Sequence, residues 1–280
     1  MHLVMILGGL SLAWLVRLNW SESTGTWTQR WRRALLSFLL PPLLLLMTAV
    51  AVLCMGPQGQ MIGLNTDWFS YCLVLGWATL AVFFCLKLAG EGWQSLQQVR
   101  AYPQIDLKGK SARLLDSSIL FSAQIGFWQP ELVVSQGLLQ KLKPEYLEAV
   151  LTHEQAHYYY RDTFWFFWLG WLRQITIWLP NTELLWQELL VLRELRADGW
   201  AARQVDALLL AESLLMVVNN QMRASENFCA AFSCAVTRNR LQERIEALLE
   251  EPEPSSESSG WIWCWVLFAL LPLVAVPFHS

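Results

Sequence analysis

The chain has 280 residues, of which 55% are hydrophobic and only 15% are charged. A soluble domain of this size normally carries more charge, and the 17 tryptophans indicate contact with a membrane interface, where this residue concentrates. The formal net charge of −3 gives no electrostatic basis for direct nucleic-acid binding. The six cysteines match no disulfide framework, zinc ribbon or redox motif.

Four apolar stretches approach the roughly 20 residues that a helix needs to cross a bilayer core. They cover about residues 1–16, 34–56, 68–86 and 261–280. We expect no cleaved signal peptide at the N-terminus, because the positive charges follow the first apolar run instead of preceding it. The sequence therefore predicts three transmembrane helices within residues 1–90 and a fourth at the C-terminal end.

The distribution of positive charge predicts the orientation in the membrane. No lysine or arginine lies between Ala34 and Leu86, whereas four arginines precede this stretch and both lysines and arginines follow it. The positive-inside rule then places the first loop and residues 91–260 in the cytoplasm, and both termini outside. Residues 250–260, E-E-P-E-P-S-S-E-S-S-G, are typical of a flexible acidic linker to the last helix.

The cytoplasmic part, residues 91–249, is predicted to be an α+β domain inserted between the third and fourth transmembrane helices of a mainly α membrane protein. Short apolar runs between Ser111 and Val134 are separated by Ser, Asp, Gly and Pro, which predicts two or three strands. From Pro144 onward the pattern is helical, and this proline suits a first helical position.

Residues 153–157 read H-E-Q-A-H on this predicted helix. His153 and His157 are then one turn apart on the same side, so both imidazoles can bind one zinc ion. Glu154 lies beside them, where a carboxylate acts as the base that removes a proton from the attacking water. Two ordinary surface histidines are the alternative, but the remaining two histidines of the chain lie at its termini. The motif therefore predicts a zinc metallopeptidase.

A catalytic zinc site of this type needs a third protein ligand. No third histidine follows at the spacing of the longer zinc motifs, so a carboxylate is expected. We favour Glu194, in V-L-R-E-L-R-A-D-G, and keep Glu183 and Glu188 as alternatives. Asp198 follows one turn later and is expected to accept the N–H of a liganding histidine. The group that stabilises the oxyanion is left open among Tyr158, Tyr159, Tyr160, Arg193 and Arg196.

Residues 163–179 form an aromatic run that is nearly long enough to cross the membrane. A single crossing would place His157 and Glu194 on opposite sides of the bilayer, where one zinc ion cannot bind both. The run is also short and contains Arg173. We therefore predict an interfacial helix, with a re-entrant hairpin as the alternative.

The cytoplasmic half resembles integral-membrane metallopeptidases of the BlaR/MecR type and, less specifically, of the HtpX type. The resemblance rests on G-F-W-Q-P-E-L-V-V-S-Q-G-L-L, E-Y-L-E-A-V-L-T-H-E-Q-A-H-Y-Y-Y-R-D, E-L-R-A-D and L-Q-E-R-I-E-A-L-L. It implies a gluzincin fold, zinc on His153, His157 and Glu194, Glu154 as the base and Asp198 as a supporting residue. The penicillin-binding sensor of the antibiotic-sensing members is missing from this sequence, which argues against β-lactam sensing.

Three functions follow as hypotheses for a protein of a bacterial inner or plasma membrane. The first is a signalling endopeptidase that cleaves a cytoplasmic or membrane-adjacent protein, with a BlaI-type repressor or the chain itself as candidate substrates. The second is a quality-control protease of the HtpX type. The third is a non-enzymatic membrane sensor or scaffold, against which the intact Glu154 argues, because a purely structural zinc needs no base.

Overall fold

The structure is a computed structural model that describes residues 2–20, 25–58, 60–61, 64–65, 67–107, 109–225, 241–250 and 267–278. In these ranges the chain is mainly helical and contains a four-stranded sheet. It divides into two compact units. The first comprises Met1–Leu88, Trp168–Leu190 and Ser255–Ser280, and the second comprises Ala89–Phe167 and Val191–Pro254.

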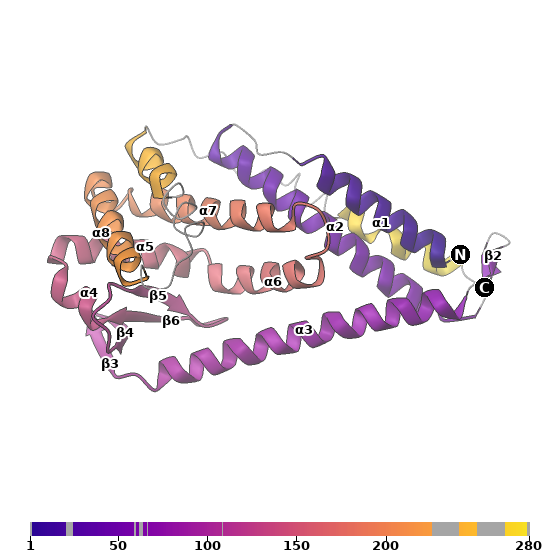
Figure 1. Cartoon of the computed structure of the whole chain (residues 1–280), viewed down its shortest axis with the longest axis horizontal. Helices are drawn as coiled ribbons and strands as arrows, with labels where there is room; N and C mark the ends of the chain where they lie inside the picture. Colours follow the sequence, from indigo (N-terminus) through magenta and orange to yellow (C-terminus); the bar gives the residue numbers. More distant parts are fainter. Residues whose placement is uncertain are drawn as a thin grey trace. The chain divides into compact units, whose positions relative to one another are not determined.

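The first unit is built around α2, which runs from Trp27 to Met55 (Figure 1). Helix α1 (His2–Leu18) and the 3-10 helix η1 (Phe268–Phe278) both pack against α2. The contact contains Ala49, Ala51, Val52 and Met55 of α2, Met5 and Ile6 of α1, and Leu273 and Val276 of η1. A short hairpin of β1 (Gln60–Met61) and β2 (Leu64–Asn65) precedes α3 (Trp68–Arg100).

The first half of α3 exposes a dense set of large apolar side chains. They include Phe69, Leu73, Leu75, Leu80, Val82, Phe83 and Leu86. Apolar exposure of this extent marks a surface that contacts a membrane or another protein. Within the described ranges, α2 and α3 are the two helices long and apolar enough to cross a membrane.

The helices at the other two predicted spans are shorter than α2 and α3 in the described residues. Helix α1 has 17 residues, and η1 has 11 residues with Pro272 and Pro277 inside it. Within the described residues, two of the four predicted spans therefore lie in a helix with the length and apolarity to cross a membrane. The predicted acidic linker 250–260 lies, apart from its first residue, outside the described residues, as do residues 261–266 of the predicted last span.

The second unit contains a four-stranded sheet with the order β3-β4-β6-β5. Its strands are β3 (Gln104–Leu107), β4 (Lys110–Leu115), β5 (Ser122–Ile125) and β6 (Glu131–Ser135). β4 and β6 are parallel, and the other neighbours are antiparallel. The sequence predicted strands between residues 111 and 134, which is confirmed, but it did not predict β3. Strand β5 lies at one edge of the sheet.

Helix α5 (Pro144–Tyr159) lies between this sheet and α8 (Ala207–Ser225), and it begins at the predicted proline. Val150 and Leu151 pack in the cluster that contains Leu132 and Val134 of β6. Ala149 packs on the other side with a cluster of residues from α7, α8 and the helical residues 241–249. The α8 members of that cluster are Leu210, Ala211 and Leu214. Packing on two sides fixes the rotation of α5 about its axis, and hence the direction of its polar side chains.

The predicted helix 163–179 is wrong in its bounds. Helix α6 runs from Asp162 to Ile175, and α7 runs from Thr182 to Ala201. A turn joins them, and in it Asn181 has a positive φ of 56°. α6 and α7 each contribute residues to both units.

Candidate metal centre

Two histidines of α5 bring their ring nitrogens together. His153 and His157 are one turn apart, and their Nε2 atoms lie 3.1 Å from each other. Both residues come from the part of α5 whose rotation the sheet and α8 determine, and His153 is buried. The i, i+4 pair of the H-E-Q-A-H motif therefore converges as predicted.

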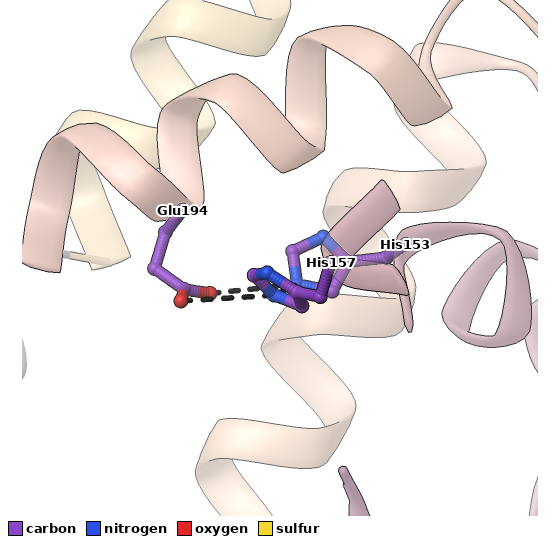
Figure 2. Close-up of side chains that lie close together, drawn as sticks. All are labelled: His153, His157 and Glu194. Carbon is purple, nitrogen blue, oxygen red and sulfur yellow. Dashed lines mark hydrogen bonds and ion pairs between the residues drawn. The ribbon is translucent and has the colours of Figure 1, made fainter. Parts of the chain in front are cut away.

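Helix α7 supplies the third group, Glu194, which faces the histidines in Figure 2. Its Oε2 lies 3.4 Å from His153 Nε2, and its Oε1 lies 3.8 Å from His157 Nε2. One ligand atom from each of the three residues fits within 4.8 Å of the others. Zinc bonds of about 2.0–2.1 Å in a tetrahedral site place ligand atoms roughly 3.3 Å apart. The observed separations fit that geometry.

Each histidine has a carboxylate at its other ring nitrogen. Nδ1 of His153 lies 2.8 Å from Oδ1 of Asp198, and Nδ1 of His157 is hydrogen-bonded to Oδ2 of Asp162 at 2.7 Å. A carboxylate only accepts hydrogen bonds, so each Nδ1 carries a proton, and in the neutral ring Nε2 then presents a lone pair. This arrangement is the usual way in which proteins orient zinc-binding histidines.

Two arginines complete these contacts. Arg244, in the helical residues 241–249, donates to Oδ2 and Oδ1 of Asp198 at 2.7 and 2.9 Å. Arg196 of α7 donates to Asp162. Bidentate or charge-assisted bonds of this kind fix the position of a carboxylate. The site therefore contains two His–Asp–Arg chains, one behind each histidine.

The centre of the site is rich in acceptors. The Nε2 lone pairs of His153 and His157 and the carboxylate of Glu194 point toward a common position, with no hydrogen between them if both rings are neutral. Such a cluster is stable only when a cation lies among the acceptors or when a ring takes up a proton. The donor set of two imidazoles and one carboxylate fits zinc, which binds these groups in catalytic sites with one position left open.

The charges around the site shift the ionisation of its members. Burial alone would lower the pKa of His153, but Asp198 and Glu194 outweigh it and raise this pKa to about 10. Burial would raise the pKa of Glu194, but His153, Arg244 and Arg193 hold it well below its ordinary value. In the metal-free site Glu194 is therefore ionised. The imidazole ring of His153 is protonated there, and a metal ion must replace one of its protons in order to bind.

Glu154 is buried beside the ligands and is held by the edge strand. Oγ of Ser122 in β5 donates to Oε1 of Glu154 at 2.8 Å, and Nε2 of Gln124 donates to its backbone carbonyl at 3.4 Å. These contacts connect β5 to α5 at Glu154, the residue predicted to be the base. Ser122 has no signal in the sequence, because a serine in a strand has no distinctive spacing.

The alternative ligands are occupied elsewhere. Glu183 pairs with Arg173, and Glu188 makes a bidentate ion pair with Arg30 of α2 at 2.9 and 3.0 Å. The structure therefore brings Glu194 to the histidines, whereas the two other carboxylates pair with arginines.

Most of the candidate oxyanion groups either bond to other residues or are exposed. Arg193 donates to Glu194 at 3.0 and 2.7 Å, and Arg196 donates to Asp162. The side chains of Tyr158 and Tyr159 are exposed. None of these residues is placed by the structure as an oxyanion donor.

Asp162 is the site residue that the spacing of the motif did not reveal. It lies five residues after His157, which is not a same-face spacing on a continuous helix. Arg161, however, has a positive φ of 54° between α5 and α6. This left-handed residue turns the chain so that Asp162 folds back onto His157.

Comparison with known proteins places these residues in a family context. A family model described as Peptidase family M48 matches residues 104–245, just over half of the chain. This span contains the three candidate ligands, Glu154 and both His–Asp–Arg chains. Searches of curated proteins and of solved structures return no match. The extent of the family match, together with a site that has the donor set of a metallopeptidase, shows that the chain belongs to peptidase family M48.

Proposed function

We propose that the protein is a membrane-embedded zinc endopeptidase. The observation that carries this proposal is the convergence of His153, His157 and Glu194 within 4.8 Å, with Glu154 on the same helix as the histidines. A scaffold or sensor that merely retained a metal would need the three ligands alone. The contact of Ser122 with Glu154 supports an enzyme, because it orients a residue that is not a ligand.

The chemistry follows from the positions of the side chains. A zinc ion held by the three ligands would polarise the scissile carbonyl and lower the pKa of a coordinated water to about 7. Glu154 receives the proton of the attacking water and returns it to the leaving amine. Ser122 donates to Oε1 of Glu154, so we assign the proton transfer to Oε2. Asp162 and Asp198 keep each histidine in the tautomer that offers Nε2.

We propose that the substrate binds as an added strand on β5. This strand lies at the edge of the sheet, and its Ser122 and Gln124 contact the residue that acts as the base. An extended peptide paired with β5 through main-chain hydrogen bonds would therefore lie across the metal ligands. Main-chain pairing demands little of the substrate sequence.

The membrane location is supported by α2 and α3, which have the length and apolarity to cross a bilayer. The exposed apolar surface of α3 would be unfavourable in water and is suited to lipid. The absence of Lys and Arg between Ala34 and Leu86 supports the cytoplasmic placement of the catalytic domain.

Two substrate ranges follow from this proposal. The resemblance to BlaR/MecR-type proteins favours regulated cleavage of one protein, such as a BlaI-type repressor, or self-cleavage in the linker 250–260. Recognition through a short edge strand favours the second range, the broad cleavage of damaged membrane proteins by an HtpX-like enzyme.

The test compares cells that produce the wild-type chain with cells that produce Glu154→Gln or Glu145→Gln. Glu145 lies in the first turn of the same helix and is exposed, so its variant controls for loss of a carboxylate. We expect Glu154→Gln to retain about one zinc per chain, because Glu154 is not a ligand. Protein fragments identified by their new termini should disappear in Glu154→Gln and persist in Glu145→Gln. Identical fragments in all three strains would refute a peptidase function.

A further inference from the structure

The α6–α7 hairpin, defined here as residues 168–190, packs among the apolar helices of the first unit. Its turn residue Leu179 is buried in a cluster with Ala13 of α1 and Leu45 of α2. Most of the buried residues of the hairpin are apolar. They are Leu169, Leu172, Ile175, Leu179, Leu185 and Leu189, beside the buried Thr176 and Thr182.

Contacts with the hairpin occur at regular intervals along α2. Glu188 pairs with Arg30, Trp186 meets the ring of Phe38 at 6.2 Å between centroids, and Leu179 packs with Leu45. The three α2 residues are seven or eight positions apart and therefore share one helix face. At 1.5 Å per residue, Arg30 and Leu45 are roughly 22 Å apart along the helix axis. The hairpin thus follows α2 from its charged first turns deep into its apolar stretch.

Two side-chain hydrogen bonds attach the hairpin to the backbones of other helices. Nε1 of Trp171 donates to the carbonyl of Ala81 in α3 at 2.8 Å. Nδ2 of Asn181 donates to the carbonyl of Arg17 in α1 at 2.9 Å. Ala81 lies within the predicted span 68–86, and Arg17 immediately follows the predicted span 1–16.

The turn satisfies its own polar groups, as a segment in hydrocarbon must. Oγ1 of Thr182 donates to the carbonyls of Thr176 and Leu179 at 2.9 and 3.0 Å. Nε1 of Trp178 donates to the carbonyl of Ile175, the last residue of α6, at 3.0 Å. These side chains therefore donate the hydrogen bonds that water donates to the carbonyls of an exposed helix end.

Charge is also absent from the turn. Residues 174–182 contain no charged side chain, and the flanking Arg173 and Glu183 pair with each other at 2.7 Å. Ile177, Trp178 and Leu184 are about half exposed or more, with relative exposures of 65%, 46% and 52%. In water each such side chain would forgo part of the stabilisation that burial of a large apolar group provides. Acyl chains remove this cost.

We propose that residues 168–190 form a re-entrant hairpin that enters the bilayer from the cytoplasmic side and returns to it. Ile177, Trp178 and Leu184 face the acyl chains at its tip. A single crossing is excluded, because His157 before the hairpin and Glu194 after it belong to one ligand cluster. This inference replaces the interfacial helix expected from the sequence, and it rests on the proposed membrane location.

The test uses a cysteine-free chain reconstituted in phospholipid vesicles, with a nitroxide label on a single introduced cysteine. Label sites are Ile177→Cys in the hairpin, Leu75→Cys on the apolar surface of α3 and Gln204→Cys on the exposed surface of the second unit. Collision rates of each label with oxygen, which partitions into lipid, and with a water-soluble nickel chelate are measured by electron paramagnetic resonance. Zinc content per chain checks that each variant retains the metal centre.

We expect the oxygen-to-nickel ratio at Ile177 to match that at Leu75 and to exceed that at Gln204 severalfold. A ratio at Ile177 equal to that at Gln204, while Leu75 reports lipid, would overturn the re-entrant hairpin and leave the membrane location intact. Water exposure at both Ile177 and Leu75 would overturn the membrane location itself.

Discussion

Replacement of Asp162 tests whether the histidine tautomers control metal binding. Asp162 is buried, accepts from Nδ1 of His157 at 2.7 Å and is bonded to Arg196. Loss of such an outer partner lowers metal affinity by about 10- to 100-fold, or about 1.4–2.7 kcal/mol. Asp162→Asn keeps an acceptor for His157 and should lie near the lower value, whereas Asp162→Ala should lie near the upper value.

The assay is competition for zinc between the purified chain and a chromogenic chelator at pH 7, with thermal unfolding as a check of the fold. Asp116→Asn is the control, since Asp116 is exposed. Because Arg196 acts through Asp162, Arg196→Gln should change zinc affinity less in the Asp162→Ala background than in the wild-type chain. Folded Asp162→Ala with zinc affinity within twofold of wild type would refute the role of the His157–Asp162–Arg196 chain.

Three further predictions concern the ligands, the base and the proton balance. Glu194→Ala should lose zinc and proteolysis together, whereas Glu188→Gln should keep its zinc; normal zinc content in Glu194→Ala, measured by elemental analysis, would contradict the ligand assignment. Ser122→Ala should lower kcat by about 10- to 100-fold, the value of one hydrogen bond to a charged group, with unchanged zinc content, and unchanged kcat would exclude a positioning role for Ser122. The pKa of His153 is raised to about 10 in the metal-free chain. The charged form of His153 therefore stabilises the folded metal-free chain. This stabilisation is complete below about pH 6.5, the ordinary histidine pKa, and is lost as the pH rises through about 10. Zinc must displace the same proton, so its affinity should rise with pH up to that point, and calorimetry at pH 7 in buffers of different ionisation enthalpy should detect release of about one proton per zinc; no release would contradict this protonation state.

The sequence predicted the local part of the site better than the long-range part. His153, Glu154 and His157 follow from one helical turn, which depends only on backbone geometry. The ion pair that engages Glu188 is made with Arg30, 158 residues away, and spacing alone does not reveal it. The same holds for the contact between Arg244 and Asp198 across 46 residues.

The sequence did not predict where the hairpin turns or how Asp162 reaches His157, because both depend on the conformation of single backbone residues. The run 163–179 is mostly apolar on both sides of Ile175, so its pattern did not show that α6 ends there. The turn depends on Asn181, which has a positive φ of 56°. Asparagine can adopt this conformation, but an asparagine in the sequence does not by itself predict it. The same is true of Arg161, where a left-handed conformation is uncommon for a residue with a long side chain.

The length of β5 has a consequence for the cleavage sites of this peptidase. Ser122–Ile125 comprises four residues, or about 13 Å at roughly 3.3 Å per residue. A peptide paired with this strand would be aligned over about four residues, and its side chains would point alternately toward α5 and away from it. Aligned cleavage sites should therefore show residue preferences at every second position and nearly random composition between them. Insertion of one residue beside the scissile bond of a good substrate should invert this pattern and move the cut, because it exchanges the two faces of the bound strand.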